Sequence, residues 1–287
     1  MNYIPAINVE EIHSRLLLML KRLHDICISN NIIYYMIGGT ALGARRHGGF
    51  IPWDDDIDIG MPRPDYERFS KLGRDKFPDF LERRWYKNTA DSPFQFIKLI
   101  DNRTTLKEFQ YDDYVEGLYI DIFPLDGVKP DSFFESLRRR SIWLQHSLII
   151  RRCSTLESTS YLGKIARKVI KKISLQKLHD RLEKTLLKVS YADSVLVANF
   201  LGAWREREIM DKRLFGTPAL YRFEDSSFFG PEKMDDYLTR LYGDFMTPPP
   251  PEKQVLRHNF PLLDFNMPYR EYELNQKKQH KDIKKLF

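Results

Sequence analysis

The sequence predicts an α/β (α+β) fold with a sheet at its core and helices around it. One observation is a helical periodicity over residues 9–29 that leads directly into a β-branched and aromatic run at 32–37. A second is a set of further short runs typical of strands, at 56–61, 94–101 and 118–127. A third is composition, because 42% apolar and 30% charged residues over 287 positions suit one large domain that buries a core.

The N-terminal elements follow from apolar spacing and from turn residues. The run "IIYYMI" at 32–37 predicts a buried strand, the glycines at 38–40 predict a tight turn, and the residues after them predict a second helix. After the strand at 56–61, Pro64 suits the first turn of another helix. The first helix, which Asn30 should end, carries an apolar stripe at Ile12, Leu16, Leu20, Leu23 and Cys27.

We expect a single domain over residues 1–287, with parts that differ in composition. The strand at 118–127 should stop at Phe123-Pro124, and a later helix should end at Gly243, before four consecutive prolines. The last residues form either a free tail or an exposed helix. The four parts are an α/β core at 1–130, a largely helical basic insertion at 131–200, a C-terminal part that packs on the core at 201–265, and a polar tail at 266–287.

The positive charge of the chain is concentrated in the basic insertion. The formal net charge is +6; residues 138–188 carry +11, from 14 Lys/Arg and 3 Asp/Glu, so the remainder carries −5. This distribution favours a polyanionic partner or an anionic surface. We expect no nucleic-acid partner, because no aromatic-basic pattern or known nucleic-acid motif accompanies the charge.

Within the insertion, the sequence indicates a cationic amphipathic helix. Its apolar stripe runs between lysines and arginines. The helix either packs on the core with its lysines in water, which we favour for most of its length, or contacts an anionic membrane at the periphery. The stripe is Leu162, Ile165, Val169 and Ile173, and the cations are Lys164, Arg167, Lys168, Lys171 and Lys172.

The sequence favours a cytoplasmic protein, at most peripheral to the inner face of a membrane. Residues 1–16 lack the basic start and apolar run of a secretion signal. The longest apolar stretch, 141–150, is shorter than the roughly 20 residues that a membrane-spanning helix needs. Cys27 and Cys153 are too few for a disulfide framework or a four-cysteine zinc site, so we expect two reduced thiols.

Four aspartates lie within five positions: Asp54, Asp55, Asp56 and Asp58. In a strand, Asp54, Asp56 and Asp58 would share one face. Carboxylates about 6.6 Å apart along a strand repel by roughly 2.5 kcal/mol at an effective dielectric of about 20. Bound protons or a bound cation would cancel this repulsion, and hard oxygen ligands suit Mg²⁺ or Mn²⁺. The alternative is an exposed acidic loop with a helix-capping aspartate, which the apolar flanking residues disfavour.

Asp121 interrupts the otherwise apolar run "LYIDIF". A lone aspartate in a buried strand is costly unless it is paired or bound to a metal. If this strand lies beside the acidic one, Asp121 completes a cluster of three carboxylates with Asp56 and Asp58. The alternative is a salt bridge to a buried cation, for which Lys98 is the nearest candidate.

Gly38-Gly39-Thr40 matches neither the P-loop nor the dinucleotide-binding pattern, and alone it is consistent with an ordinary turn. Between a strand and a helix, however, it presents free N–H groups and the positive end of the helix dipole to a phosphate. A phosphate site and a carboxylate cluster within 20 residues together predict metal-assisted phosphoryl or nucleotidyl transfer.

Taken in order, these motifs resemble the LicD family within the nucleotidyltransferase-fold superfamily. The blocks are "GGTALGARRHGGFIPWDDDIDIGMPRPDYERF", "FIKLID", "GLYIDIFPLDG" and "LYGDFMTPPPPEK". They fall within residues 38–126 and 241–258, and the segment 131–200 takes no part. The resemblance implies a nucleotidyltransferase-like mixed sheet flanked by helices, with the basic segment as an insertion.

The resemblance also implies site residues. The metal carboxylates correspond to Asp56 and Asp58, with Asp121 as the third, and the implied cofactor is Mg²⁺ or Mn²⁺. Donor phosphates are expected at Gly38, Gly39 and Thr40, and at the cations Arg46 and Lys98. Further candidates are Asp54, the histidines His47 and His258 as donor contacts or base, and Trp53 as a stacking partner. For the histidines and the tryptophan, ordinary packing is the alternative.

The implied reaction transfers a phospho-alcohol, best known as phosphocholine, from a CDP-linked donor to a hydroxyl of a cell-surface glycan or its lipid-linked precursor, and releases CMP. Asp121 would bind metal and accept the proton of that hydroxyl. One alternative is a nucleotidyltransferase that uses an NTP and releases pyrophosphate. Another is a non-catalytic scaffold that binds a glycan or a membrane.

Overall fold

The computed structural model of the protein describes residues 8–111, 114–156, 161–256, 258 and 260–285, and it confirms the α+β class. At its centre lies a mixed sheet of strand order β1-β2-β7-β4-β3, continued from the end of β7 by β8 and β9. β2 and β7 are parallel, and the other described pairs are antiparallel. The strands are β1 (Tyr35–Met36), β2 (Asp58–Pro62), β3 (Leu81–Arg84), β4 (Ile97–Asp101), β7 (Tyr119–Val128), β8 (Leu196–Ala198) and β9 (Met210–Asp211).

Smaller antiparallel sheets lie at the edges of this core. One is a hairpin of β10 (Ala219–Phe223) and β11 (Ser226–Gly230). In another, β5 (Thr105–Lys107) lies between β6 (Val115–Glu116) and β12 (Leu262–Asp264). Short 3-10 turns occur at Arg74–Lys76, Phe109–Tyr111, Arg205–Glu208, Lys212–Leu214 and Pro251–Lys253.

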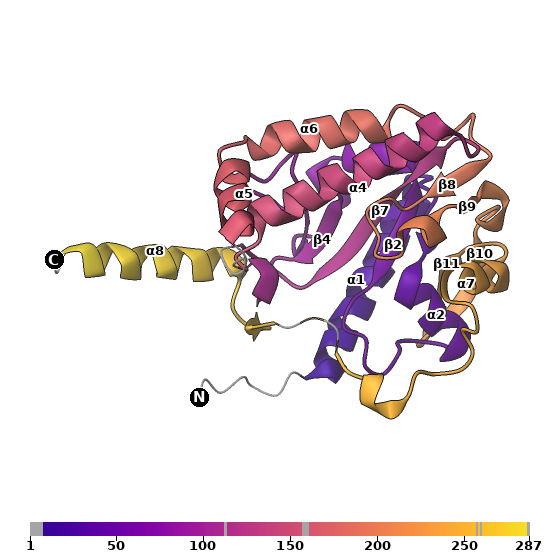
Figure 1. The fold of residues 1–287 in the computed structure, drawn as a ribbon. Helices are drawn as coiled ribbons and strands as arrows, with labels where there is room; N and C mark the ends of the chain where they lie inside the picture. The colour runs from indigo at the N-terminus through magenta and orange to yellow at the C-terminus, as the bar shows by residue number, and fades with distance from the viewer. Residues whose placement is uncertain (1–7, 112–113, 157–160, 257, 259, 286–287) are drawn as a thin grey trace.

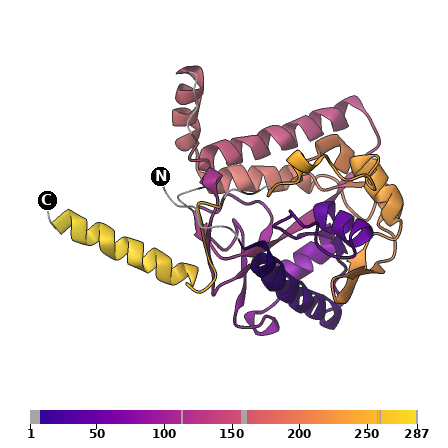
Figure 2. The ribbon, with the colours of Figure 1, turned by 90° about the horizontal axis from the view of Figure 1, so that it is seen from below.

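Helices cover both faces of the central sheet (Figure 1). α1 lies on one face, and α4 and α6 lie together on the opposite face (Figures 1 and 2). α5 and α8 extend away from the body of the molecule (Figure 2). The helices are α1 (Val9–Ser29), α2 (Gly38–Arg46), α3 (Arg63–Ser70), α4 (Phe133–Cys153), α5 (Tyr161–Lys171), α6 (Leu175–Leu186), α7 (Met234–Tyr242) and α8 (Tyr269–Lys285).

The predicted first helix is confirmed as α1. The Asn8 side chain caps it by accepting the N–H of Glu11 at 3.2 Å, and Asn30 is its C-cap. The apolar stripe expected from the spacing is buried along its whole length. The start of α3 is confirmed as well, with Pro64 in its first turn.

The tight turn expected at residues 38–40 is instead the first turn of α2. The strand before it is shorter than predicted, because β1 pairs only with β2, and only at Tyr35 and Met36. Gly38 has a φ of +55°, in the left-handed region, so a glycine here lets the chain pass from strand to helix without a linking loop.

The prediction that the strand stops at Phe123-Pro124 is wrong, because β7 continues to Val128. Its pairing with β4 ends at Ile122, and its pairing with β8 begins at Asp126. Pro124 lies between these two pairings, where β2 is its only ladder neighbour among the described residues. A residue without an N–H is tolerated in such a gap.

The helical basic insertion is confirmed as α4, α5 and α6. A buried ion pair anchors it: Arg63 Nε of α3 lies 2.6 Å from Asp126 Oδ1 of β7, and Arg63 Nη1 lies 3.4 Å from Glu183 Oε1 of α6. On and just after α5, Val169 and Ile173 are 57% and 40% exposed, so this end of the stripe does not pack on the core. The side chains of Leu162 and Ile165 lie outside the described part.

The C-terminal part supplies α7 and the hairpin, and the polar tail supplies α8. α7 ends at Gly243, as predicted, with a φ of +77° at that glycine. The polar tail is helical from Tyr269 to Lys285. Residues 1–7, where a secretion signal would begin, lie outside the described residues. Neither cysteine is in a disulfide. No helix formed by the described residues has the length and apolar character to cross a bilayer.

Candidate active site

Asp58 and Asp121 lie side by side on the two parallel strands of the sheet. Their Cα atoms are register partners in the β2–β7 pairing, so both side chains project from the same face. Each is the one residue of its strand that is not fully buried. The predicted neighbourhood of these two strands is therefore confirmed, and the two carboxylates form the floor of the candidate active site.

Burial gives both carboxylates a high proton affinity. Burial raises the pKa of Asp121 to about 8, against the attraction of Lys98. Burial also raises the pKa of Asp58 well above its ordinary value, and the charges of Asp56 and Asp121 add to this. Oδ1 of Asp121 is buried and has no hydrogen-bond partner among the described residues. Such an oxygen needs a proton or a cation.

Strand alternation predicted that Asp54 and Asp56 share a face with Asp58. This prediction is wrong. β2 begins at Asp58, and Asp54, Asp55 and Asp56 lie in the loop before it. Asp54 is 8% exposed and lies against the start of α2, since a Cβ on Gly39 would be 2.6 Å from Asp54 Oδ2. The fold of this loop, and not strand periodicity, places its carboxylates.

Asp55 holds His258 at the site. Its Oδ1 lies 2.7 Å from His258 Nδ1, and its Oδ2 accepts the backbone N–H of His258 at 3.2 Å. Asp56 Oδ2 lies 3.9 Å from the same ring nitrogen. Burial alone would lower the pKa of His258, but the hydrogen bond and charge of Asp55 and the charge of Asp56 raise it to about 9. The two neighbouring carboxylates thus favour the cationic form of the imidazole, which suits contact with a phosphate, and its role as a base stays a prediction.

Two residues that the sequence argument missed hold the acidic loop from other elements. His13 of α1 has its Nε2 2.7 Å from the carbonyl oxygen of Asp54, and its ring stacks on Phe50 at 4.0 Å. Glu224, at the turn of the β10–β11 hairpin, accepts the N–H of Phe50 at 2.9 Å. A histidine within a helix and a glutamate in a distant turn carry no local signal of this role.

The glycine segment packs on the carboxylates. A Cβ on Gly38 would lie 2.9 Å from Asp58 Oδ2, so the glycine allows the start of α2 to approach this carboxylate closely. The N–H of Gly38 donates to the Tyr237 hydroxyl of α7 at 2.9 Å and is not free for a phosphate, contrary to the prediction. Gly39 and Thr40 also lie in the first turn of α2, so their N–H groups have no acceptor within the helix. Their contact with a donor phosphate stays a prediction.

Thr40 has a second role that the sequence does not reveal. Its Oγ1 accepts the backbone N–H of Asp58 at 2.8 Å and so fixes the start of β2 relative to α2. We expect Thr40→Val to lower activity by about 10- to 100-fold, because a buried N–H left without an acceptor costs roughly 1–3 kcal/mol and displaces the Asp58 backbone. Thr40→Ser, which keeps the hydroxyl, should retain activity in the same turnover assay. Equal activity of the Val and Ser variants would contradict this role.

Lys98 does not face an open phosphate site. It is 1% exposed, and its Nζ donates to Glu108 Oε1 at 2.8 Å and to Glu116 Oε1 at 2.9 Å. It pairs with Asp121 in the β4–β7 register without forming the salt bridge that was the alternative for Asp121. Lys98 was predicted to contact donor phosphates. The structure disfavours this contact, because the carboxylates of Glu108 and Glu116 already neutralise its buried ammonium group.

Arg46, His47 and Trp53 lie together at the other end of α2. The Arg46 Nη1 donates to the carbonyl oxygen of Phe245 at 2.9 Å, and the His47 and Trp53 rings meet edge to face at 6.2 Å. Burial lowers the pKa of His47, and the Arg46 charge acts in the same direction. His47 is exposed and Trp53 is partly buried. Their donor contacts stay predictions.

Glu208, which the sequence argument did not single out, is a further buried carboxylate near the site. It is 6% exposed and packs on Gly202, where a Cβ would lie 2.5 Å from its Oε1. Burial raises its pKa to about 7. Its charge raises the pKa values of both Tyr237 and Asp58, so it lies close enough to act on both groups.

This raised pKa predicts a pH-dependent stability. A carboxyl whose folded pKa of about 7 exceeds its ordinary value of 4.5 contributes stability at low pH that is lost as pH rises from about 4.5 to 7. Glu208→Gln should therefore stabilise the protein by about 2–3 kcal/mol at pH 8 and very little at pH 4.5. Urea unfolding at both pH values measures the difference. Glu10→Gln, at an exposed position, is the control, and a pH-independent effect of Glu208→Gln would refute the assignment.

Carboxylates and one histidine at the site are candidate ligands for a cation. Among the described residues, Asp55, Asp56 and His258 offer ligand atoms within 4.8 Å of one another. His258 contributes a ring nitrogen to this trio, and Asp55 and Asp56 contribute carboxylate oxygens. Asp56, Asp58 and Asp121 offer carboxylate oxygens, one of them buried without a partner, but these three residues do not form such a close group among the described residues, and their metal binding stays a prediction. Oxygen-only donors of this kind suit Mg²⁺ or Mn²⁺.

Comparison with known proteins finds similarity to one family. A family model described as LicD/FKTN/FKRP, nucleotidyltransferase domain, matches residues 31–151. The lipopolysaccharide cholinephosphotransferase LicD of Haemophilus influenzae is 29% identical over 253 residues, which are 84% of this chain and 92% of that protein.

More distant matches are shorter. The ribitol 5-phosphate transferase FKRP of Homo sapiens is 57% identical over 28 residues, 10% of this chain and 6% of FKRP. Mannosyltransferase regulator 4 of Saccharomyces cerevisiae is 26% identical over 127 residues, 43% of this chain and 11% of that protein. The family model covers α2, β2 and the β7 residue Asp121, which build the carboxylate site, and the Haemophilus match extends over most of the chain. Residues 31–151 are thus similar to the LicD/FKTN/FKRP nucleotidyltransferase domain, and the chain is similar to LicD over most of its length.

Proposed function

We propose that this LicD-like phosphotransferase transfers a phospho-alcohol, in the first place phosphocholine, from a CDP-linked donor to a hydroxyl of a cell-surface glycan or its lipid-linked precursor, and releases CMP. The observation that carries the proposal is the Asp58–Asp121 pair, with the unpartnered Oδ1 of Asp121, at the start of α2. The cholinephosphotransferase name of the Haemophilus relative supports the choice of alcohol, and the ribitol 5-phosphate transferase match supports the broader class.

Each part of the site has a role in this reaction. Asp56, Asp58 and Asp121 would hold Mg²⁺ or Mn²⁺, which supplies positive charge at the donor pyrophosphate. The N–H groups of Gly39 and Thr40 and the positive end of the α2 dipole would face the same oxygens. Asp121 accepts the proton of the acceptor hydroxyl as that oxygen attacks the phosphorus that bears the alcohol, and CMP leaves. His258 offers a cation near the leaving phosphate.

The basic insertion supports a peripheral contact with an anionic membrane at its cytoplasmic face. α5 projects from the body (Figure 2), and Val169 and Ile173 are exposed close to Lys168 and Lys172. Apolar side chains between lysines favour the interface of an anionic bilayer. Such a position would bring the site close to a lipid-linked acceptor.

The test is product release by the purified protein with Mg²⁺ and a panel of CDP-alcohols, with CTP alongside and membrane glycan as acceptor. We expect metal-dependent CMP release from one CDP-alcohol, which names the donor. Pyrophosphate released from CTP would instead favour nucleotidyl transfer by the same site. Failure to release either product, together with failure to bind metal or nucleotide in calorimetry, would favour the non-catalytic scaffold.

A further inference from the structure

The outer face of α4 presents large apolar side chains to solvent. Phe133 and Phe134, at the start of the helix, are 72% and 81% exposed, and their rings meet edge to face at 5.8 Å. Leu137 follows within one turn, and Leu144, three turns from Phe133, is 62% exposed. Single exposed apolar side chains are ordinary, but a row of them along one helix marks a surface of interaction.

The same side of α4 carries free positive charge. Residues 133, 137, 140, 144 and 151 follow one another at spacings of four, three, four and seven, so they line one stripe of the helix. Arg140 and Arg151 of this stripe are exposed, and neither forms an ion pair with another described residue. The stripe therefore combines apolar and cationic side chains, as helices at a membrane interface do.

Acidic side chains close to the stripe are already paired. Glu135, the single carboxylate in the sequence of α4, is buried and lies 2.6 Å from Arg138. Asp131, just before the helix, lies 2.9 Å from Arg139. These pairs leave the charges of the outer stripe without an offset from the helix itself.

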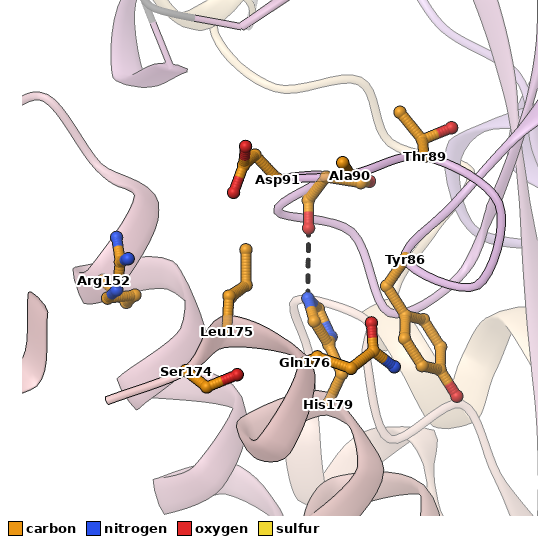
Figure 3. Close-up of a pocket in the computed structure, with 10 residues that line it drawn as sticks. Tyr86, Thr89, Ala90, Asp91, Arg152, Ser174, Leu175, Gln176 and His179 are labelled. Carbon is orange, nitrogen blue, oxygen red and sulfur yellow. Dashed lines mark hydrogen bonds between the residues drawn. The ribbon is translucent and has the colours of Figure 1, made fainter. Parts of the chain in front are cut away.

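The inner side of α4 is fixed to the core through α6. Ile142 and Ile149 are fully buried, and Gln145 Nε2 donates to Thr185 Oγ1 of α6 at 3.2 Å. α6 is in turn held by His179, whose Nε2 lies 3.0 Å from the carbonyl oxygen of a residue in the loop after β3, Ser92 (Figure 3). Because the inner side is anchored, α4 presents a constant face outward.

α5 lies on the same side of the molecule as this face. In Figure 2, α4 forms one edge of the body, and α5 rises from the end of that edge away from the body. Val169 and Ile173 are exposed there beside Lys168 and Lys172. One side of the protein thus carries exposed apolar and cationic side chains on two helices.

The charge of this side selects its occupant. Residues 138–188 carry a formal charge of +11, from 14 Lys/Arg and 3 Asp/Glu. A second copy of the chain docked through the same side would bring these charges together, and like charges across an interface oppose association. An anionic bilayer offers the opposite charge at its surface and an interfacial region that accepts apolar side chains.

We propose that the outer face of α4 is the surface by which the protein docks on an anionic bilayer. α4 would lie along the bilayer surface, with its apolar side chains in the interfacial region and its arginines on lipid phosphates. The link between this docking and a lipid-linked acceptor rests on the proposed function, whereas the docking itself does not. The face consists of Phe133, Phe134, Leu137, Arg140, Leu144 and Arg151.

Sedimentation of the full chain with vesicles, without any donor, tests the docking. We expect binding to vesicles of phosphatidylglycerol that weakens as salt is raised, and little binding to phosphatidylcholine vesicles. Phe134→Ser should weaken the binding by about 10-fold, because the ring no longer enters the interface. Arg140→Gln should weaken it by about fivefold, through the loss of one charge at the surface.

Matched controls lie on α1, which covers the opposite face of the sheet (Figure 1). Ile28 is 52% exposed, so Ile28→Ser removes an apolar side chain from that face. Arg22 is exposed as well, so Arg22→Gln removes a charge there. Both variants should bind phosphatidylglycerol vesicles like the wild type.

Three results would overturn the proposal: no binding to phosphatidylglycerol vesicles, equally strong binding to phosphatidylcholine, or losses as large in the α1 variants as in the α4 variants. Dimerisation in ultracentrifugation that Phe134→Ser abolishes, without vesicle binding, would also overturn it and assign the face to a second copy. Vesicle binding that Lys168→Gln weakens but the α4 variants keep would restrict the contact to α5 and reject the role of α4.

The docking and the proposed reaction can fail separately. Vesicle binding by a protein that releases no CMP would reject the reaction and leave the docking standing. CMP release by a protein that binds no vesicles would reject the docking alone.

Discussion

Asp58→Asn should reduce phospho-alcohol transfer by about 10³-fold or more and leave the fold intact. A bound cation contributes several kcal/mol to stabilising the transition state, and each 1.36 kcal/mol is about tenfold in rate. The substitution keeps the size of the side chain and the backbone N–H that donates to Thr40. Burial and neighbouring carboxylates raise the pKa of Asp58, so a charge at this position is unfavourable in the absence of metal. Without metal, the Asp58→Asn variant should therefore have a melting temperature equal to or higher than that of the wild type.

Two measurements on the same samples check this expectation. CMP release gives the loss of activity, and thermal unfolding with and without MgCl₂ reports cation binding, which should raise the melting temperature of the wild type more than that of the variant. Asp236→Asn, on the exposed side of α7, is the matched control and should behave as the wild type. Near wild-type turnover by Asp58→Asn would show that the metal assignment is wrong.

The pairing of Asp58 with Asp121 could be predicted because each strand carries its own signal. An apolar run with one aspartate is conspicuous in both segments, and burial makes an isolated carboxylate costly enough to imply a partner. The first helix was equally predictable, since its stripe and its end at Asn30 are local.

The parts that could not be predicted depend on residues far apart in the sequence. Asp55 acquires its role from His258, 203 positions away, and the N–H of Gly38 is bonded to Tyr237, 199 positions away. Strand periodicity also gave a wrong prediction for Asp54 and Asp56. These residues lie in the loop before β2, so their side chains do not alternate as in a strand. Local patterns cannot show which distant side chain will reach a donor or a carboxylate.

Lys98 is the clearest case, and Lys98→Met should destabilise the fold strongly. Removing one partner of a buried ion cluster leaves uncompensated charge and costs about 3–5 kcal/mol. Lys98 is 1% exposed between Glu108 and Glu116, whose side chains are 17% and 2% exposed. The melting temperature should fall by roughly 10 °C.

The same variant separates a structural role for Lys98 from the predicted phosphate contact. If the lysine only neutralises the two glutamates, Lys98→Met with Glu116→Gln should recover part of the lost stability, because one buried charge is removed with the other. Folded Lys98→Met at low temperature should then bind a CDP-alcohol within a few-fold of the wild type in calorimetry. Lys71→Met, at an exposed position, controls for the loss of a charge. A fall in donor affinity of about 100-fold with little change in melting temperature would instead place the ammonium group on the donor phosphates.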